Sequence, residues 1–141
     1  MNDDYAALRR RHLRFGWYAL LGFASLGALL EVLHAFKAGF YLDVGSETRR
    51  LMWRLAHAHG VLLGLVQLGF AFTLPHAAED ARRRLECASA CLIAAGSLLP
   101  LGFFLGGVFA TGGDPGLPVL LVPLGIPLLL AGLWWTARSL R

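Results

Sequence analysis

The sequence has few charged residues and many apolar ones. Only 16% of its 141 residues are charged, whereas 57% are hydrophobic and the mean hydropathy is +0.59. Soluble domains contain about 45–50% apolar residues. The scarcity of charge and the apolar excess together argue against a soluble globular domain and indicate a protein that lies in lipid.

Cysteine is also scarce, with only two in the chain. Cys87 and Cys91 are four residues apart, so a helix would stack them about one turn apart on one face, and that geometry does not favour a disulfide. A soft-metal site at these thiols would need further ligands, and none stands nearby in the sequence. We therefore expect both to be small apolar packing residues.

Several functional motifs are absent. The sequence shows no nucleophile–base pattern typical of hydrolases, no phosphate-binding loop, and no soluble basic and aromatic surface for nucleic acid. No linker, repeat or low-complexity segment divides the chain. We therefore predict a single integral membrane domain over residues 1–141 with no nucleic-acid partner. The pattern leaves open whether it is an enzyme and which residues would be catalytic.

Four apolar stretches are long enough to cross a bilayer, whose hydrocarbon core needs about 20 helical residues. Ionisable residues interrupt them only near one end of the first and second stretches. The fold class is therefore predicted to be all-α, a four-helix transmembrane bundle. The expected spans are Phe15–Phe36, Leu51–Leu74, Cys87–Ala110 and Leu117–Ala137.

The arginines set the expected topology. Nine of the thirteen Lys and Arg residues lie before the first stretch, between the second and third, or after the fourth. By the positive-inside rule both termini are cytoplasmic (N-in/C-in), in a multi-pass protein of the bacterial inner membrane. Residues 2–14 are expected to form a short N-terminal interfacial helix on anionic headgroups, with His12 at the interface rather than in a functional site.

The most informative feature is a cluster of ionisable residues near the expected outer ends of the first two spans. Glu31 and His34 share one face of the first span, and Arg54, His57 and His59 stand near the start of the second. An ionisable side chain within a membrane costs free energy, so it usually has a partner or a function. Two antiparallel helices would bring these residues to the same depth.

The two histidines of the second span point in nearly opposite directions, because residues two apart on a helix are separated by about 200°. His57 shares a small and polar face with Gly60 and Gly64, and this face allows another helix to approach closely. We therefore expect His57 to lie between helices. His59 shares a bulky apolar face, and we expect it to face a second cavity, a bound cofactor or a neighbouring subunit.

These side chains have the chemistry of a transition-metal site. A Glu-x-x-His pair on a helix is a spacing used in carboxylate-bridged metal bundles, but a di-metal site needs further carboxylates that the spans lack. A mononuclear site for zinc, copper or iron could use Glu31, His34 and His57, with His59 as a further candidate ligand.

A haem is suggested by a resemblance. The segment Ala58-His59-Gly60, which opens an apolar run, resembles the low-spin haem helix of subunit I of the haem-copper oxidases, and similar starts occur in small four-helix bacterial membrane proteins. The resemblance implies at most one b-type haem, with His59 as an axial ligand and His34 as the candidate opposite ligand. Arg50 or Arg54 would lie near the propionates. The later paired histidines of that family are missing, so oxygen reduction is not implied.

Other interpretations stay open at this point. The histidines and Glu31 could be structural in a non-catalytic membrane subunit, or they could serve a proton relay or a substrate site. Gln67 and Ser97 could line the polar path of a small transporter. Glycine-rich faces would suit a homo-oligomer or a larger membrane complex within the lipid bilayer. The working hypothesis is a haem- or metal-binding module near the outer face that serves electron transfer.

Overall fold

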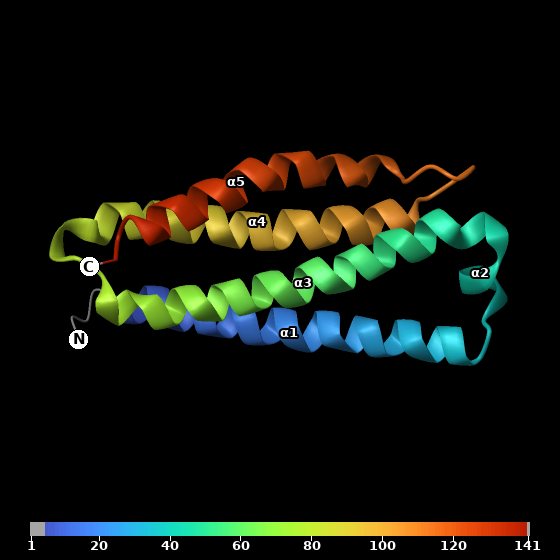
Figure 1. Ribbon diagram of the computed structural model, residues 1–141, viewed down its shortest axis with the longest axis horizontal. Coiled ribbons are helices and arrows are strands. Elements are labelled where there is room, and N and C mark those ends of the chain that lie inside the picture. Colours follow the sequence, from blue (N-terminus) through green and yellow to red (C-terminus); the bar gives the residue numbers. More distant parts are fainter. Residues whose placement is uncertain (1–4, 141) are drawn as a thin grey trace.

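The computed structural model describes residues 5–140 and consists of helices and short connections (Figure 1). A short helix, α2 (Gly39–Leu42), lies between the first two long ones, and no β-strand occurs in the described residues. All four long helices are long and apolar enough to cross a membrane. The fourth reaches this length together with the 3-10 turn Leu117–Leu120 that precedes it. This confirms the all-α fold with four candidate spans. The long helices are α1 (Ala6–Ala35), α3 (Glu47–Thr73), α4 (Arg82–Val108) and α5 (Leu121–Ala137).

The predicted short N-terminal helix is not a separate element. α1 is one continuous helix from Ala6, so residues 6–14 are its first turns rather than a separate interfacial helix. Residues 2–4 of that prediction lie outside the described part of the chain. His12 and Gly16 in this segment are buried against α3 and α4, so protein contacts hold it.

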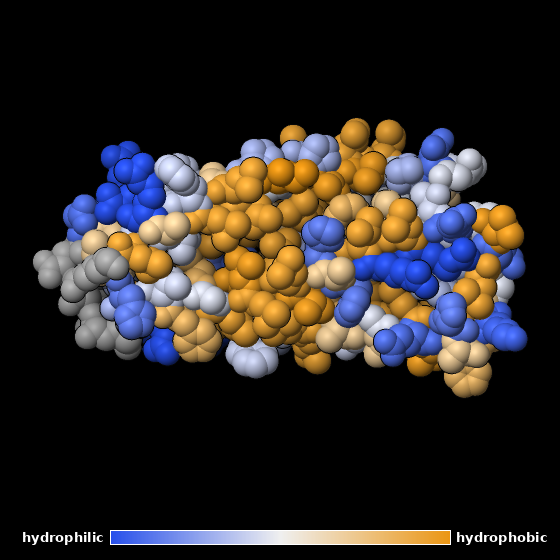
Figure 2. All heavy atoms as spheres, viewed as in Figure 1, coloured by the Kyte–Doolittle hydropathy of each residue, from blue (hydrophilic) through white to orange (hydrophobic). Residues whose placement is uncertain are grey.

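Each long helix packs against the next in sequence: α1 on α3, α3 on α4, and α4 on α5. Short connections make these neighbours antiparallel, and Figure 1 shows both termini at one end of the molecule and α2 at the other. Figure 2 shows an apolar band across the middle with hydrophilic residues gathered towards both ends. This surface pattern is the one expected of a bundle that spans a bilayer.

Glycines let α1 and α3 approach closely. A Cβ atom added to Gly60 would lie 2.0 Å from the Phe23 ring, and one added to Gly27 would lie 2.3 Å from the His57 ring. Each helix therefore places a ring over a glycine of the other. One turn along from Gly60, a Cβ on Gly64 would also meet the α1 backbone. The close approach predicted for this face of α3 is confirmed.

We expect Gly60→Ala to lower the free energy of unfolding by about 1–3 kcal/mol, because a methyl group would overpack a filled interface. Gly69→Ala on the same helix is the matched control. Nothing lies within 4 Å of the Cβ that it would add, so the higher helix propensity of alanine should leave stability unchanged or slightly raised. Unfolding by SDS in mixed micelles measures both variants. Equal stabilities would contradict the close packing of Phe23 on Gly60.

Candidate functional site

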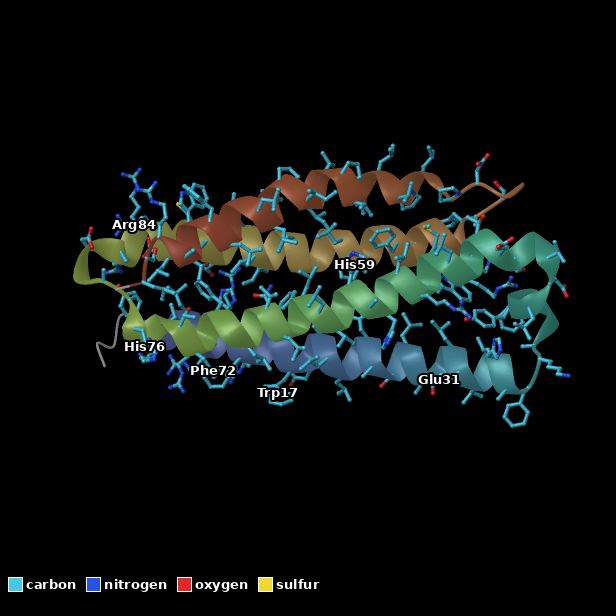
Figure 3. All side chains as sticks on the ribbon, viewed as in Figure 1. Trp17, Glu31, His59, Phe72, His76 and Arg84 are labelled. Carbon is cyan, nitrogen blue, oxygen red and sulfur yellow. The ribbon has the colours of Figure 1, made fainter. Side chains whose placement is uncertain are left out.

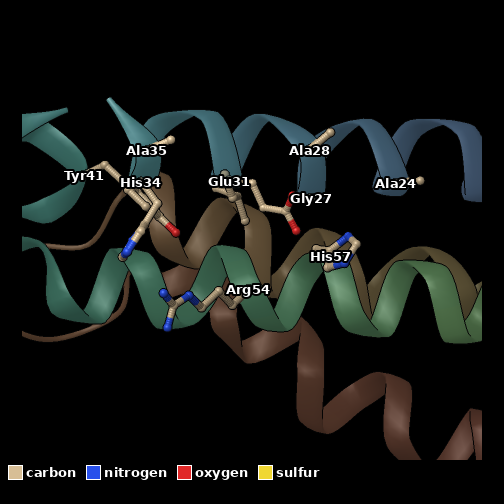
Figure 4. A pocket seen from close by; sticks show the side chains of 10 residues that line it. Ala24, Gly27, Ala28, Glu31, His34, Ala35, Tyr41, Arg54 and His57 are labelled. Atoms are coloured by element: carbon tan, nitrogen blue, oxygen red, sulfur yellow. The ribbon is translucent and has the colours of Figure 1, made fainter. Parts of the chain in front are cut away.

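A pocket lies between α1 and α3, at the end of the bundle that carries α2 (Figure 4). Its volume is about 680 Å³, and small-molecule and cofactor sites typically measure roughly 300–1,000 Å³. Much of the α1 wall consists of small residues, and these leave the space open. They are Ala24, Gly27, Ala28 and Ala35.

Four ionisable residues expected to lie together do line this pocket. Glu31 and His34 come from α1, and Arg54 and His57 come from α3. The three-residue spacing puts the first two on one face of α1, and the antiparallel packing of α3 brings the other two to the same level. In the part of the chain that the structure describes, Glu31, His34 and Arg54 make no hydrogen bond or ion pair. Their polar atoms are therefore available to a ligand.

His57 has the most closely defined position in the pocket. Its half-buried ring lies over Gly27, and its Nδ1–H donates to the carbonyl oxygen of Phe23 at 2.7 Å. A carbonyl oxygen only accepts, so Nδ1 carries a proton, and the neutral form of this ring would have its lone pair on Nε2. Histidines that bind metals are commonly held by such a hydrogen bond from their other ring nitrogen.

His59 lies on another side of α3 and is not part of the pocket lining (Figure 3). Its Nδ1–H donates to the carbonyl oxygen of Leu55 at 2.8 Å, and its ring packs against Phe103 of α4 with the ring centroids 4.8 Å apart. The structure therefore does not bring His59 and His34 to one pocket as an axial pair. The physical reason is the two-residue spacing from His57, which turns one histidine towards α1 and the other towards α4.

No cluster of metal ligands is found among the side chains that the structure describes. Within that set, no three His, Cys, Asp or Glu side chains lie close enough together to hold one ion. The predicted ligands Glu31, His34 and His57 therefore surround a common pocket without converging on one point. Cys87 and Cys91 are free thiols, as their spacing predicts.

Arg50 and Arg54, both considered for the acidic groups of a ligand, have different surroundings. Arg50 donates from Nη1 to the carbonyl oxygens of Tyr41, at 3.0 Å, and Asp43, at 3.1 Å, and so holds the loop around α2 in place. Arg54 is exposed and lines the pocket. Of the two, Arg54 is the one whose guanidinium can reach a ligand.

A second polar cluster, which the sequence did not predict, is buried in the half of the bundle near the termini. His12 of α1 stands between Gln67 of α3 and Ser89 of α4, and none of the three is more than 1% exposed. His12 Nδ1 lies 2.5 Å from Gln67 Oε1, and Nε2 lies 2.7 Å from Ser89 Oγ. We call this cluster the His12–Gln67–Ser89 latch. The expectation that His12 is interfacial is wrong, because its ring is enclosed by three helices.

Hydrogen-bond chemistry gives the latch one direction. Gln67 Nε2 donates to the carbonyl oxygen of Leu92 at 2.8 Å, which turns its Oε1 towards His12. The His12 Nδ1–H then donates to Oε1, and Nε2 accepts from the Ser89 hydroxyl. All three side chains are thus hydrogen-bonded, as buried polar groups in a membrane protein need to be.

The latch side chains Ser89, His12 and Gln67 are connected in the same order as the nucleophile, the base and the orienting group of a catalytic triad. Its serine, however, is only 1% exposed, and it lines neither the pocket above nor a smaller one of about 370 Å³ between α1 and α4. A substrate could not reach Ser89 without separating the helices. The latch therefore has a structural role, fastening α1 to both α3 and α4.

The contacts of Gln67 also show whether this residue could line a transport path. Its side chain is fully buried, and both ends of its amide are bound, one to His12 and one to Leu92. Ser97 donates back to the carbonyl oxygen of Ile93 in its own helix. Gln67 is therefore a packing residue of the helix interface and does not line an open path.

Comparison with known proteins gives no assignment. The chain matches no family model, no curated protein and no solved structure.

Proposed function

We propose that the protein binds one b-type haem in the pocket between α1 and α3 and serves electron transfer. The observation that carries this proposal is the geometry of His57. Its Nδ1–H is bound to the Phe23 carbonyl oxygen, which would leave the Nε2 lone pair to hold a haem iron. His57 takes the place that the resemblance gave to His59, and His34, in the lining of the same pocket, would be the second residue to hold the haem.

The donor set fits a haem better than a bare metal ion. A metal held by protein alone needs three or four ligands at one point, whereas a haem iron needs only one or two side chains. The pocket offers two histidines, an arginine for the propionates, and a wall of small apolar residues against a macrocycle. A bound haem would supply one-electron chemistry. The protein's own residues would set its orientation and exclude water from its apolar face.

The proposed site lies near the outer face of a bacterial inner membrane, with both termini cytoplasmic. Support comes from the arginines, since eight of the thirteen basic residues lie within residues 9–14, 82–84 and 138, in the segments towards the end of the molecule where α1 begins and α5 ends. By the positive-inside rule this end faces the cytoplasm. The pocket, at the α2 end, then opens near the opposite side of the membrane.

Optical spectra of the detergent-purified protein, oxidised and dithionite-reduced, test the proposal when combined with elemental analysis of the same sample. We expect a Soret band, sharp reduced α and β bands, and stoichiometric haem iron. A colourless protein with stoichiometric zinc or copper would replace the haem by a metal site. A protein that shows no colour and contains no metal after haem-supplemented expression would contradict the proposal of a bound cofactor. The alternative is then a non-catalytic membrane subunit in which the His57–Phe23 hydrogen bond simply joins two helices.

If a haem is bound, Arg54→Gln should raise its dissociation constant roughly tenfold, because one charge-assisted hydrogen bond to a propionate is lost. Arg83→Gln is a suitable control, since Arg83 is exposed in the first turn of α4, and this turn lies at the end of the bundle opposite α2. Haem titration monitored at the Soret band measures both. Equal affinities for the two variants would remove Arg54 from the site.

A further inference from the structure

We propose that α1, through Gly27 and the Phe23 carbonyl group, is the element that sets the tautomer and direction of His57. The inference rests on the proposed function insofar as it concerns a ligand-binding histidine. The tautomer itself is a property of the protein without any ligand. Gly27 and Phe23 would then be positioning residues of the site, although neither donates a side-chain atom to it.

The first observation is the hydrogen bond between helices. His57 belongs to α3, yet its Nδ1–H donates to a carbonyl oxygen of α1, 34 residues away in the chain. His59 makes the corresponding bond within its own helix, to Leu55. The orientation of His57 therefore depends on how α1 packs against α3, whereas that of His59 depends on α3 alone.

The second observation is the space at Gly27. An added Cβ would lie 2.3 Å from His57 Cε1, 2.5 Å from Nδ1 and 2.9 Å from Nε2, so the whole ring edge occupies the volume that a side chain would fill. Any residue larger than glycine must displace the imidazole. A displaced ring loses its alignment with the Phe23 carbonyl oxygen, and with it the reason for Nδ1 to hold the proton.

The consequence for the pocket follows from the chemistry of imidazole. A neutral ring with the proton fixed on Nδ1 has one lone pair, on Nε2. A hydrogen bond from Nδ1–H makes Nε2 a better electron-pair donor to a metal. Freed from Phe23, the ring would exchange between tautomers, and part of the population would have a proton on Nε2. Such a ring cannot bind a metal through that atom until the proton leaves.

The matched pair of variants is Gly27→Ala and Gly22→Ala. Both add a methyl group to α1, but nothing lies within 4 Å of the Cβ added at Gly22. Protein labelled with ¹⁵N-histidine, in detergent and without haem, reports the protonation of each ring nitrogen by NMR, and a His57→Gln sample identifies the His57 signals. We expect the Nδ1–H tautomer for His57 in the wild type and in Gly22→Ala, and mixed tautomers in Gly27→Ala.

Two results would overturn the inference. The first is a wild-type His57 that is protonated on Nε2 or exchanges between tautomers, and this measurement stands even if Gly27→Ala fails to fold. The second is a folded Gly27→Ala that keeps the wild-type His57 signals. Where haem is bound, Gly27→Ala should also weaken it about 10–100-fold, as loss of such an outer contact usually does. Wild-type tautomer signals in a protein that binds no haem would reject the proposed function alone.

Discussion

His12→Ala is expected to lower the free energy of unfolding in detergent micelles by about 3–5 kcal/mol. Removing the ring leaves Gln67 Oε1 and the Ser89 hydroxyl without their partner, at about 1–3 kcal/mol for each buried group left unsatisfied. It also leaves a cavity beside Phe70, whose ring centroid is 4.3 Å from that of His12. Unfolding by SDS in mixed micelles, followed by far-ultraviolet circular dichroism, measures the change.

His76→Ala is the control for this prediction, because it makes the same substitution outside the proposed haem pocket. His76 is exposed, and its side chain has no hydrogen bond or ion pair within the part of the chain that the structure describes, so stability should change by less than about 0.5 kcal/mol. Hydrogen bonds between membrane helices contribute only about 0.6 kcal/mol on average. A loss below about 1 kcal/mol in His12→Ala would therefore mean that the latch is no stronger than an ordinary contact.

The double variant His12→Phe/Gln67→Leu separates the two causes of this loss. It removes a donor and an acceptor together and refills the space with apolar side chains, a change that can be close to neutral. The Ser89 hydroxyl can then return to the carbonyl oxygen four residues earlier in its own helix. The double variant should consequently be more stable than His12→Ala. Equal destabilisation would point to misfit of the new side chains rather than to stranded polar groups.

The spans and the composition of the pocket could be predicted because each depends on local spacing. Twenty apolar residues define a span wherever they occur, and the three-residue step from Glu31 to His34 fixes a common face. The small residues Gly60 and Gly64 indicated the side of α3 that faces another helix. His57 lies on the same side by helical spacing, so its direction could be predicted as well. The sequence therefore placed Glu31, His34 and His57 around one pocket before the packing was known.

The latch could not be predicted in the same way, because it depends on three helices meeting. The arginines around His12 suggested headgroups, and local sequence does not say that α4 passes close enough for Ser89 to reach the ring. One signal was present: His12 lies on the same helical face as Gly16 and Phe23, the face that packs on α3. The roles of Arg50 and Arg54 likewise depend on where the α2 loop folds, which spacing alone does not determine.

The largest functional effect is expected for His57→Ala, which should reduce haem affinity more than about 100-fold, because it removes the nitrogen proposed to hold the haem iron rather than an outer contact. His59→Ala is the matched control, two residues away on the same helix and likewise half-buried with its Nδ1 bound to a backbone carbonyl oxygen. It should leave haem affinity within about threefold of the wild type, since a packing change there is worth less than 1 kcal/mol at the pocket. Haem titration at the Soret band, with reduced spectra of each variant, measures both.

These two variants show whether His59 or His57 holds the haem. The Ala-His-Gly pattern implies His59 as the ligand, whereas the pocket between α1 and α3 implies His57. Loss of haem in His59→Ala with retention in His57→Ala would place the cofactor between α3 and α4, beside Phe103, and leave the pocket without that role. Loss in both variants would require a haem that reaches across α3, which the nearly opposite directions of the two rings do not allow within one chain. That result would therefore call for a histidine from a second copy.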